Sequence, residues 1–322
     1  MIRKIKTASP YFLILFLVVL LIGFNAITSK IKAADTSNTS VVVGNAAPTV
    51  SSVSFADGDD FSLTEGTTKT ITVRALVTDT NGCADVWNGS VKAYMYQETQ
   101  TVSCSADLDD CYLIASCSTD ATRNNCTEGT DPDVIMACTA NIQYFAVATD
   151  NTSSDSADKW SATVTATDEA GDDHSAANTS QTVDIILGRA LEASASINFD
   201  AISKGSNTGA TPIEMGVRNT GNSGIDPYIA GTTVLTCVSG GCSVGVDTIL
   251  NANQNYASVS QDYSDAYNVT LTGSNVQFNT ETPKPDHATY PVDDQIFWGL
   301  GVDGGQQLGT YQGVNTFTAT GD

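Results

Sequence analysis

The run Thr68-Lys-Thr-Ile71-Thr-Val73-Arg-Ala75-Leu-Val77 decides the fold class of this chain. Apolar and polar residues alternate along it, and its apolar residues are rich in β-branched side chains. A period of two turns one set of side chains toward a core and the other toward solvent. The run therefore predicts a half-buried β-strand.

Runs of the same kind lie on both sides of this strand, bounded by clusters of Gly, Asn and Asp. No convincing amphipathic helix pattern follows the N-terminal segment. The fold class is therefore predicted to be all-β, with two antiparallel β-sandwich domains. The further strands are expected at residues 50–55, 91–96, 142–147, 160–167 and 182–187 in the first domain, and at 195–199, 212–217, 232–237, 269–272, 295–300 and 315–319 in the second.

The domain plan follows from changes in composition along the chain. A Ser/Thr/Asn-rich stretch at residues 34–47 is expected to be a flexible arm or a leading strand, since it contains the β-branched island Val41-Val42-Val43. The first sandwich is expected at residues 48–187, with a polar, cysteine-rich insertion at 98–133. After the joint Gly188-Arg189-Ala190, the second sandwich is expected at residues 191–322.

The N-terminus indicates export. Basic residues precede an unbroken apolar run at residues 11–22, and small residues end at Ala33 and Ala34. This layout predicts a secretory signal peptide over residues 1–33. The alternative is an uncleaved membrane anchor, because neighbouring apolar residues bring the run near the roughly 20 residues that a span needs. The membrane is expected as a partner only through this segment, if it stays uncleaved.

The charge of the chain excludes one class of partner. It has 14 Lys and Arg, five of them within residues 1–33, and 36 Asp and Glu, all of which come later. Without the leader the net charge is 9 − 36 = −27. Phosphate groups are bound by clustered Lys and Arg, so no nucleic acid partner is expected. A soluble exterior protein, or one that gathers cations, fits this charge.

Three stretches carry a resemblance to a known group of proteins. Ala47-Pro48-Thr-Val-Ser resembles a leading strand, the segment from Val73 to Asp85 a second strand with its Asp-x-Asn-Gly turn, and the segment from Trp160 to Gly171 a penultimate strand with its Asp-x-x-Gly turn. Residues 48–187 thus resemble the immunoglobulin-like modules, of the cadherin, PKD and fibronectin type, in bacterial and archaeal surface proteins. The resemblance implies an immunoglobulin-like first domain with a disulfide-rich insertion.

The second domain has a weaker likeness. Val217-Arg-Asn219-Thr-Gly221-Asn222 and the segment from Gly309 to Phe317 resemble exterior β-domains, including those of filament-forming camelysin-type proteins.

All eight cysteines lie after the leader, where an oxidising compartment would join them as disulfides. In the topology that the resemblance implies, the turn with Cys83 and the start of the strand with Cys138 lie at one end of the sandwich. Spacing alone leaves other connectivities of the first six cysteines open. The predicted pairs are Cys83–Cys138, Cys104–Cys111, Cys117–Cys126 and Cys237–Cys242.

Oxygen-bearing side chains gather at two turns. Asp79, Asn81 and Asp85 lie on the first, and Asp168 and Asp172 on the second. Calcium takes six to eight oxygen ligands, usually from loops, and turns at one end of the resembled folds converge. These five residues are therefore the candidate calcium ligands. The alternative is that Asp and Asn simply form the turns. No other cofactor is expected.

No catalytic signature is present. The two histidines, His174 and His287, are isolated, no G-x-S-x-G motif occurs, and the cysteine gaps do not suit zinc. The chain is therefore expected not to be an enzyme. Aromatic residues in the second domain, Trp298 and Tyr256 among them, offer either a core or a glycan platform.

Together these features predict a non-enzymatic, exported structural or adhesive protein of the extracellular cell surface. Its expected partners are other surface proteins or glycans, and copies of itself. One alternative is a self-assembling filament or surface-layer subunit that uses an N-terminal donor strand. The other is a glycan-binding module or glycoside hydrolase.

Overall fold

In the computed structural model, residues 45–322 form one compact unit. The predicted signal peptide or anchor at residues 1–33 lies outside the described residues except for Ile14 and Val18. Within the part of the chain that is described, no helix has the length and apolarity needed to cross a membrane. The described residues are 14, 18, 39–41, 44–56, 58–88, 90–100, 104–120, 122–123, 126–127, 131–177, 181–231, 233–265, 268–287 and 293–321.

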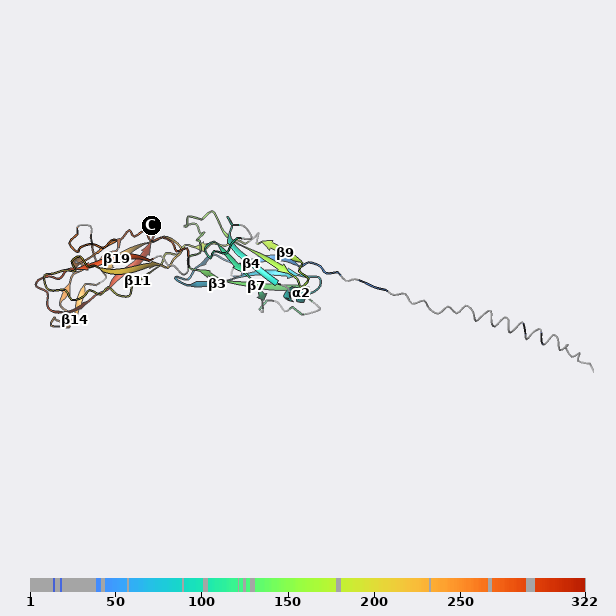
Figure 1. The fold of residues 1–322 in the computed structure, drawn as a ribbon, viewed down its shortest axis with the longest axis horizontal. Coiled ribbons are helices and arrows are strands. Elements are labelled where there is room, and N and C mark those ends of the chain that lie inside the picture. The colour runs from blue at the N-terminus through green and yellow to red at the C-terminus, as the bar shows by residue number, and fades with distance from the viewer. Residues whose placement is uncertain are drawn as a thin grey trace, which may run out of the picture. The chain divides into compact units, whose positions relative to one another are not determined.

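The first sandwich has the strand order of an immunoglobulin domain (Figure 1). One sheet has the order β1-β3-β7-β6, which corresponds to strands A, B, E and D of an immunoglobulin domain. The other has the order β5-β4-β8-β9. In it β4, β8 and β9 correspond to strands C, F and G, and β5 lies beside β4. All neighbours in both sheets are antiparallel. The bounds are β1 Thr49–Phe55, β3 Thr68–Thr78, β4 Ser90–Gln97, β5 Cys111–Ile114, β6 Ser118–Thr119, β7 Asp133–Gln143, β8 Trp160–Thr167 and β9 Asp173–Ala177.

The alternating run of β3 builds this core as the sequence predicts. Ile71, Val73, Ala75 and Val77 are all buried, while the residues between them are partly exposed. Trp160 of the facing sheet is fully buried in the same cluster. At about 25 cal/mol per Å² of apolar surface, the isoleucine and each of the two valines contribute about 1.5–3 kcal/mol when buried.

Several local elements differ from the prediction. Residues 83–88 form the short helix α2 (Cys83–Asn88), where only a turn was expected. Its buried residues Cys83 and Val86 are three positions apart, as on one face of a helix, but six residues are too few to give a visible periodic pattern. The strand expected at 142–147 falls earlier, as β7, and the insertion at 98–133 supplies the edge strands β5 and β6.

Two disulfides differ from the predicted pairs. Cys83 is joined to Cys126, and Cys117 to Cys138, so Cys83–Cys138 and Cys117–Cys126 were wrong. Cys138 lies in the middle of β7, not at its start. The backbone N–H of Cys83 donates to Asp131 O, just before β7 begins. The other two bonds are the predicted Cys104–Cys111 and Cys237–Cys242.

The second sandwich uses residues 191–320. One sheet has the order β11-β12-β19-β16-β17, and two three-stranded ladders, β18-β13-β21 and β15-β14-β20, make up the rest. In its core, Met215 of β12 and Trp298 of β19, which lie in the first of these sheets, pack with Ile229 of β13 from one of the ladders. The bounds are β11 Leu191–Ala193, β12 Ile213–Asn219, β13 Asp226–Gly231, β14 Leu235–Gly240, β15 Thr248–Ile249, β16 Gln254–Ala257, β17 Val269–Thr270, β18 Val276–Gln277, β19 Asp293–Leu300, β20 Gly309–Gln312 and β21 Asn315–Thr320; the short 3₁₀ helix η1 spans Asn251–Asn253.

The chain passes between the sandwiches after β10 (Ile185–Ile186), which pairs in parallel with β2 (Phe61–Ser62). Asn222 fastens this joint, since its Oδ1 accepts from Gly188 N at 2.6 Å and its Nδ2 donates to Ala146 O at 3.2 Å. A Cβ at Gly221 would lie 2.3 Å from Gly188 O, so only glycine fits there.

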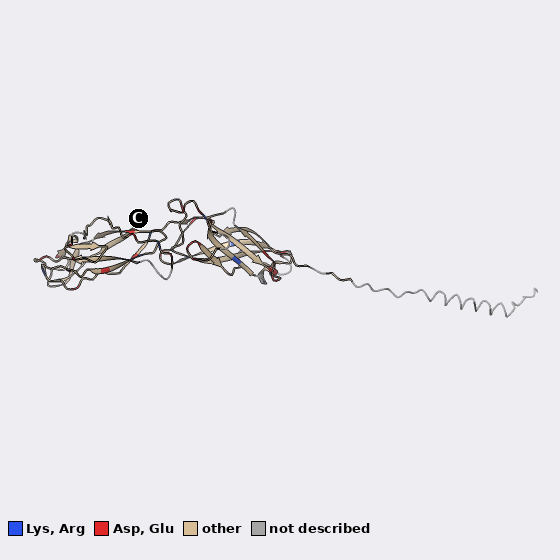
Figure 2. Cartoon of the chain, turned by 45° about the horizontal axis from the view of Figure 1, so that its top comes forward, with Lys and Arg blue, Asp and Glu red and all other residues tan. Residues whose placement is uncertain are grey.

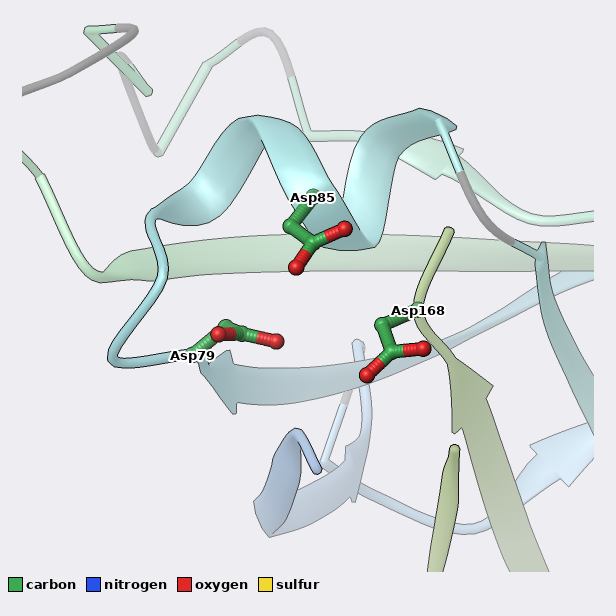
Figure 3. Close-up of side chains that lie close together, drawn as sticks. All are labelled: Asp79, Asp85 and Asp168. Atoms are coloured by element: carbon green, nitrogen blue, oxygen red, sulfur yellow. The ribbon is translucent and has the colours of Figure 1, made fainter. Parts of the chain in front are cut away.

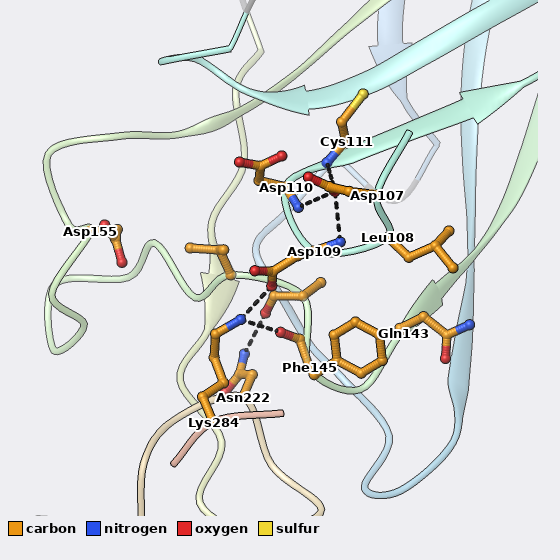
Figure 4. Close-up of polar contacts among 12 residues, drawn as sticks. Asp107, Leu108, Asp109, Asp110, Cys111, Gln143, Phe145, Asp155, Asn222 and Lys284 are labelled. Carbon is orange, nitrogen blue, oxygen red and sulfur yellow. Dashed lines mark hydrogen bonds and ion pairs between the residues drawn. The ribbon is translucent and has the colours of Figure 1, made fainter. Parts of the chain in front are cut away.

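A second contact at the joint is ionic (Figure 4). Lys284 Nζ donates to Asp109 Oδ1, and also to Phe145 O at 2.9 Å. Burial raises the pKa of Asp109, and the Lys284 ammonium opposes that rise. The two side chains are 27% and 28% exposed, so this pair is partly shielded from water.

Candidate metal centre

Three carboxylates meet at one end of the first sandwich (Figure 3). Asp79 directly follows β3, Asp85 is in the first turn of α2, and Asp168 directly follows β8. Each offers one oxygen, and these oxygens all lie within 4.8 Å of one another. Strand ends from the two facing sheets thus bring together residues that are far apart in the sequence.

Asp79 is the buried centre of this cluster. Its side chain has no exposed surface, and its Oδ1 accepts from Asn81 N at 2.7 Å. Its Oδ2 is buried and has no hydrogen-bond partner among the described residues. A buried charged oxygen without a partner is costly, and a cation bound by this atom would offset that cost.

The other two carboxylates are held by backbone donors. Asp85 Oδ1 accepts from Glu169 N at 3.2 Å, and Asp168 Oδ1 accepts from Asp172 N at 2.9 Å. Asp85 is partly exposed, whereas Asp168 is 3% exposed. The cluster is therefore preformed by the two turns and opens to solvent on the side of Asp85.

The electrostatics of the cluster differ from one carboxyl to the next. Burial raises the pKa of Asp79, and the charges of Asp85 and Asp168 raise it further, against the hydrogen bond from Asn81. Burial also acts to raise the pKa of Asp168, but hydrogen bonds from Asn45 and nearby backbone N–H groups outweigh it, so the net shift is downward. Close negative charges of this kind are relieved by a cation.

The other two predicted ligands, Asn81 and Asp172, lie beside the cluster and bind the residues just before Pro48, which we call the root of the arm. Asn81 Oδ1 accepts from Ala46 N at 2.8 Å, and Asp172 Oδ2 accepts from Asn45 Nδ2 at 3.0 Å. Asn45 Nδ2 also donates to Asp168 Oδ2 at 2.7 Å. Asn45 was missed by the sequence reasoning, which treated the residues before Pro48 as a flexible arm.

The donor set fits a hard divalent cation. Carboxylate oxygens are what calcium and magnesium prefer, and calcium accepts irregular geometry more readily than the octahedral Mg²⁺. Asp79, Asp85 and Asp168 would hold the ion, and water would complete its shell on the exposed side. Asp and Glu residues are spread along both sandwiches (Figure 2), but no other group comparable to this cluster is found among the described residues.

Trp298 and Tyr256 of the second sandwich are placed for packing. Trp298 and Tyr256 are fully buried, with ring centroids 5.2 Å apart, and Phe317 lies 6.0 Å from Trp298. Neither Trp298 nor Tyr256 is therefore available as an exposed platform for a sugar. His174 is exposed, and its Nδ1 accepts from Val50 N at 3.1 Å, which gives it a structural contact.

The fold and the disulfides define a class: an all-β chain of antiparallel sandwiches, the first immunoglobulin-like, whose four disulfides indicate folding in an oxidising compartment. No protein-family model matches the chain, and no curated protein matches it.

Among solved structures, the chain is similar to the CsuC-CsuE chaperone-tip adhesion subunit pre-assembly complex from archaic chaperone-usher Csu pili of Acinetobacter baumannii. The identity is 11%, the match covers 81% of this chain and 96% of that chain, and the TM-score is 0.33. The strand pairing described above, and not this distant likeness, carries the fold assignment.

Proposed function

We propose that this chain is an exported structural or adhesive protein of the cell surface, and that a calcium ion braces its first sandwich. The observation that carries the proposal is the buried, unpartnered Oδ2 of Asp79 in a group of three carboxylates. Modules that work outside the cell commonly bind calcium with dissociation constants of about 10⁻⁴–10⁻³ M.

The position of the cluster supports a bracing role. Its ligands come from β3, α2 and the end of β8, so an ion would tie both sheets at one end of the sandwich. Asp168 also holds Asn45, which begins the compact unit. A cation here would set how firmly the chain before Asn45 is attached to the sandwich.

The first test is calcium titration of the exported chain by isothermal calorimetry, beside Asp79→Asn and Asp59→Asn variants. Asp59 is exposed and lies outside the cluster, which makes it the matched control. We expect one calcium per chain, loss of binding in Asp79→Asn and unchanged binding in Asp59→Asn. Equal binding by all three chains would refute the site.

The second test concerns location. Protease added to intact host cells should cleave the chain while cytosolic marker proteins stay whole. Full protection of the chain until the cells are lysed would contradict a surface role, whatever the calcium result.

A further inference from the structure

The second sandwich has an open groove along one edge, with a volume of about 920 Å³. We define this lateral groove by its floor, which consists of Met215, Leu235, Ile249, Gln254 and Leu300, and by its lining stretches, residues 194–202 and 306–315. Among the floor residues, Met215, Ile249 and Leu300 are at most 6% exposed. The groove therefore opens onto the core of the sandwich.

Both lining stretches present backbone that lacks a partner strand. β20 and β21 each stand last in their ladders, so each has one edge with no partner strand among the described residues. Residues 195–202 form no strand, although one was predicted at 195–199, and no hydrogen bond joins them to the described part of the chain. Unpaired strand edges are templates for an added strand.

The stretch after β11 has the side-chain pattern of a strand without its hydrogen bonds. Ile197 and Phe199 are partly buried and pack against the core, while Ser196, Asn198 and Asp200 are exposed. The alternation of these side chains predicted a strand, but among the described residues no neighbouring strand pairs with this stretch.

The floor also contains an unsatisfied donor. Gln254 is 1% exposed, and its Oε1 accepts from Asn315 Nδ2 at 3.2 Å. Its Nε2 is buried and has no partner among the described residues. A backbone carbonyl brought into the groove would give this amide an acceptor.

We propose that the lateral groove binds the arm of a second copy of this chain as an added β-strand. The arm supplies Val41-Val42-Val43, a β-branched run suited to an extended strand. Val41 is 83% exposed, whereas Val42 and Val43 lie outside the described residues. Backbone hydrogen bonds to β20 and β21 would supply the affinity. Alternate valine side chains packed on the apolar floor would fix the register of the added strand.

The arm cannot reach the groove of its own chain. Its root is fixed at the Thr78 end of β3, because Ala46 N donates to Asn81 Oδ1. The second sandwich meets the other end of β3, where Gly66 N donates to Thr220 O at 3.0 Å. β3 has 11 residues and so spans about 37 Å, whereas Val41 precedes Asn45 by only about 14 Å of extended chain.

The contact is therefore between different patches on two copies. A head-to-tail interface of this kind extends into open chains when its rotation does not close a ring. The inference goes beyond the proposed function and does not depend on the calcium site.

The test uses a full-length chain with Val41, Val42 and Val43 all changed to Asp, which leaves its groove free. A fluorescent peptide of residues 36–47 is titrated into it and followed by anisotropy. We expect saturable binding, with protection of residues 309–320 from hydrogen exchange. A peptide carrying the same three Asp changes should not bind.

Leu308→Arg in the titrated chain tests the position of the contact. Leu308 lines the groove and is 70% exposed, so its change should weaken peptide binding at least about tenfold without unfolding the chain. Val246→Arg is the matched control, at 73% exposure and outside the groove lining. No peptide binding, equal binding by both variants, or protection confined to other strands would each overturn the proposal.

Discussion

Cys117 lies directly opposite Cys138 across the antiparallel pair of β6 and β7, with a Cα–Cα distance of 4.3 Å. The pairing of Ser118 with Ala137 sets this register. Cys117 N also donates to Val91 O of the other sheet, at 2.9 Å. The disulfide thus fastens the point where the chain crosses from one sheet to the other.

Removing this disulfide should cost more than removing Cys237–Cys242. The two bonds close loops with sequence separations of 21 and 5 residues, and loop entropy gives about 3 and about 2 kcal/mol respectively. Urea unfolding of the two double-Ala variants measures the difference. Non-reducing peptide mapping should recover Cys117–Cys138 and Cys83–Cys126. Recovery of Cys83–Cys138 instead would contradict the topology of the insertion.

Asp110 should give the chain a pH dependence near pH 6. Burial, followed by the hydrogen bond and charge of Asp107, raises the pKa of Asp110 to about 6. A carboxyl whose pKa is higher in the folded state binds its proton more tightly there. Its contribution to stability is thus full below about pH 4 and is lost as pH rises through about 6.

The neighbouring Asp107 shifts the other way: its pKa is lowered, because hydrogen bonds from backbone N–H groups outweigh its burial. Its contribution is therefore lost only as pH falls into the acid range. Between pH 5 and 7, the unfolding free energy of the wild type should fall as the pH rises, and Asp110→Asn should make this fall smaller. Urea unfolding at three pH values measures this, and identical slopes would count against the assignment.

Lys284→Ala should loosen the joint between the sandwiches. It removes the bonds to Asp109 and Phe145 O and leaves a half-buried carboxylate alone. A hydrogen bond to a charged group contributes about 1.5–3 kcal/mol, and partial exposure brings the expected loss to about 1–2 kcal/mol. Lys92→Ala, at an exposed position on β4, is the control. Equal unfolding free energies for the two variants would show that the contact adds nothing.

The period-two pattern was enough to predict several of the longer strands. β1, β3, β4 and β8 fall where alternation placed them, because one face of each strand is buried. The short elements gave no such signal. α2 has six residues, fewer than two helical turns, and β5 has four residues, the first of them a cysteine, so local composition could not separate them from loop.

The sequence predicted which types of residue would form the candidate site, but not which of the five predicted residues would bring their oxygens together. Asp79, Asp85 and Asp168 were found because Asp clusters follow predicted strands. Which oxygens meet depends on the twist and stagger of two facing sheets, which no local pattern encodes. Asn45 was missed for that reason, and so was the position of Cys138 within β7.

Thermal unfolding in chelator and in calcium tests the central claim most directly. Calcium at a hundredfold above its dissociation constant stabilises the folded chain by about 2.7 kcal/mol, which should raise the wild-type melting temperature by about 5–10 °C. Asp79→Asn should show no calcium shift, and in chelator it should melt no lower than the wild type, because it removes a buried and repelled charge. A wild-type melting temperature that is the same in chelator and at this calcium concentration would contradict the account.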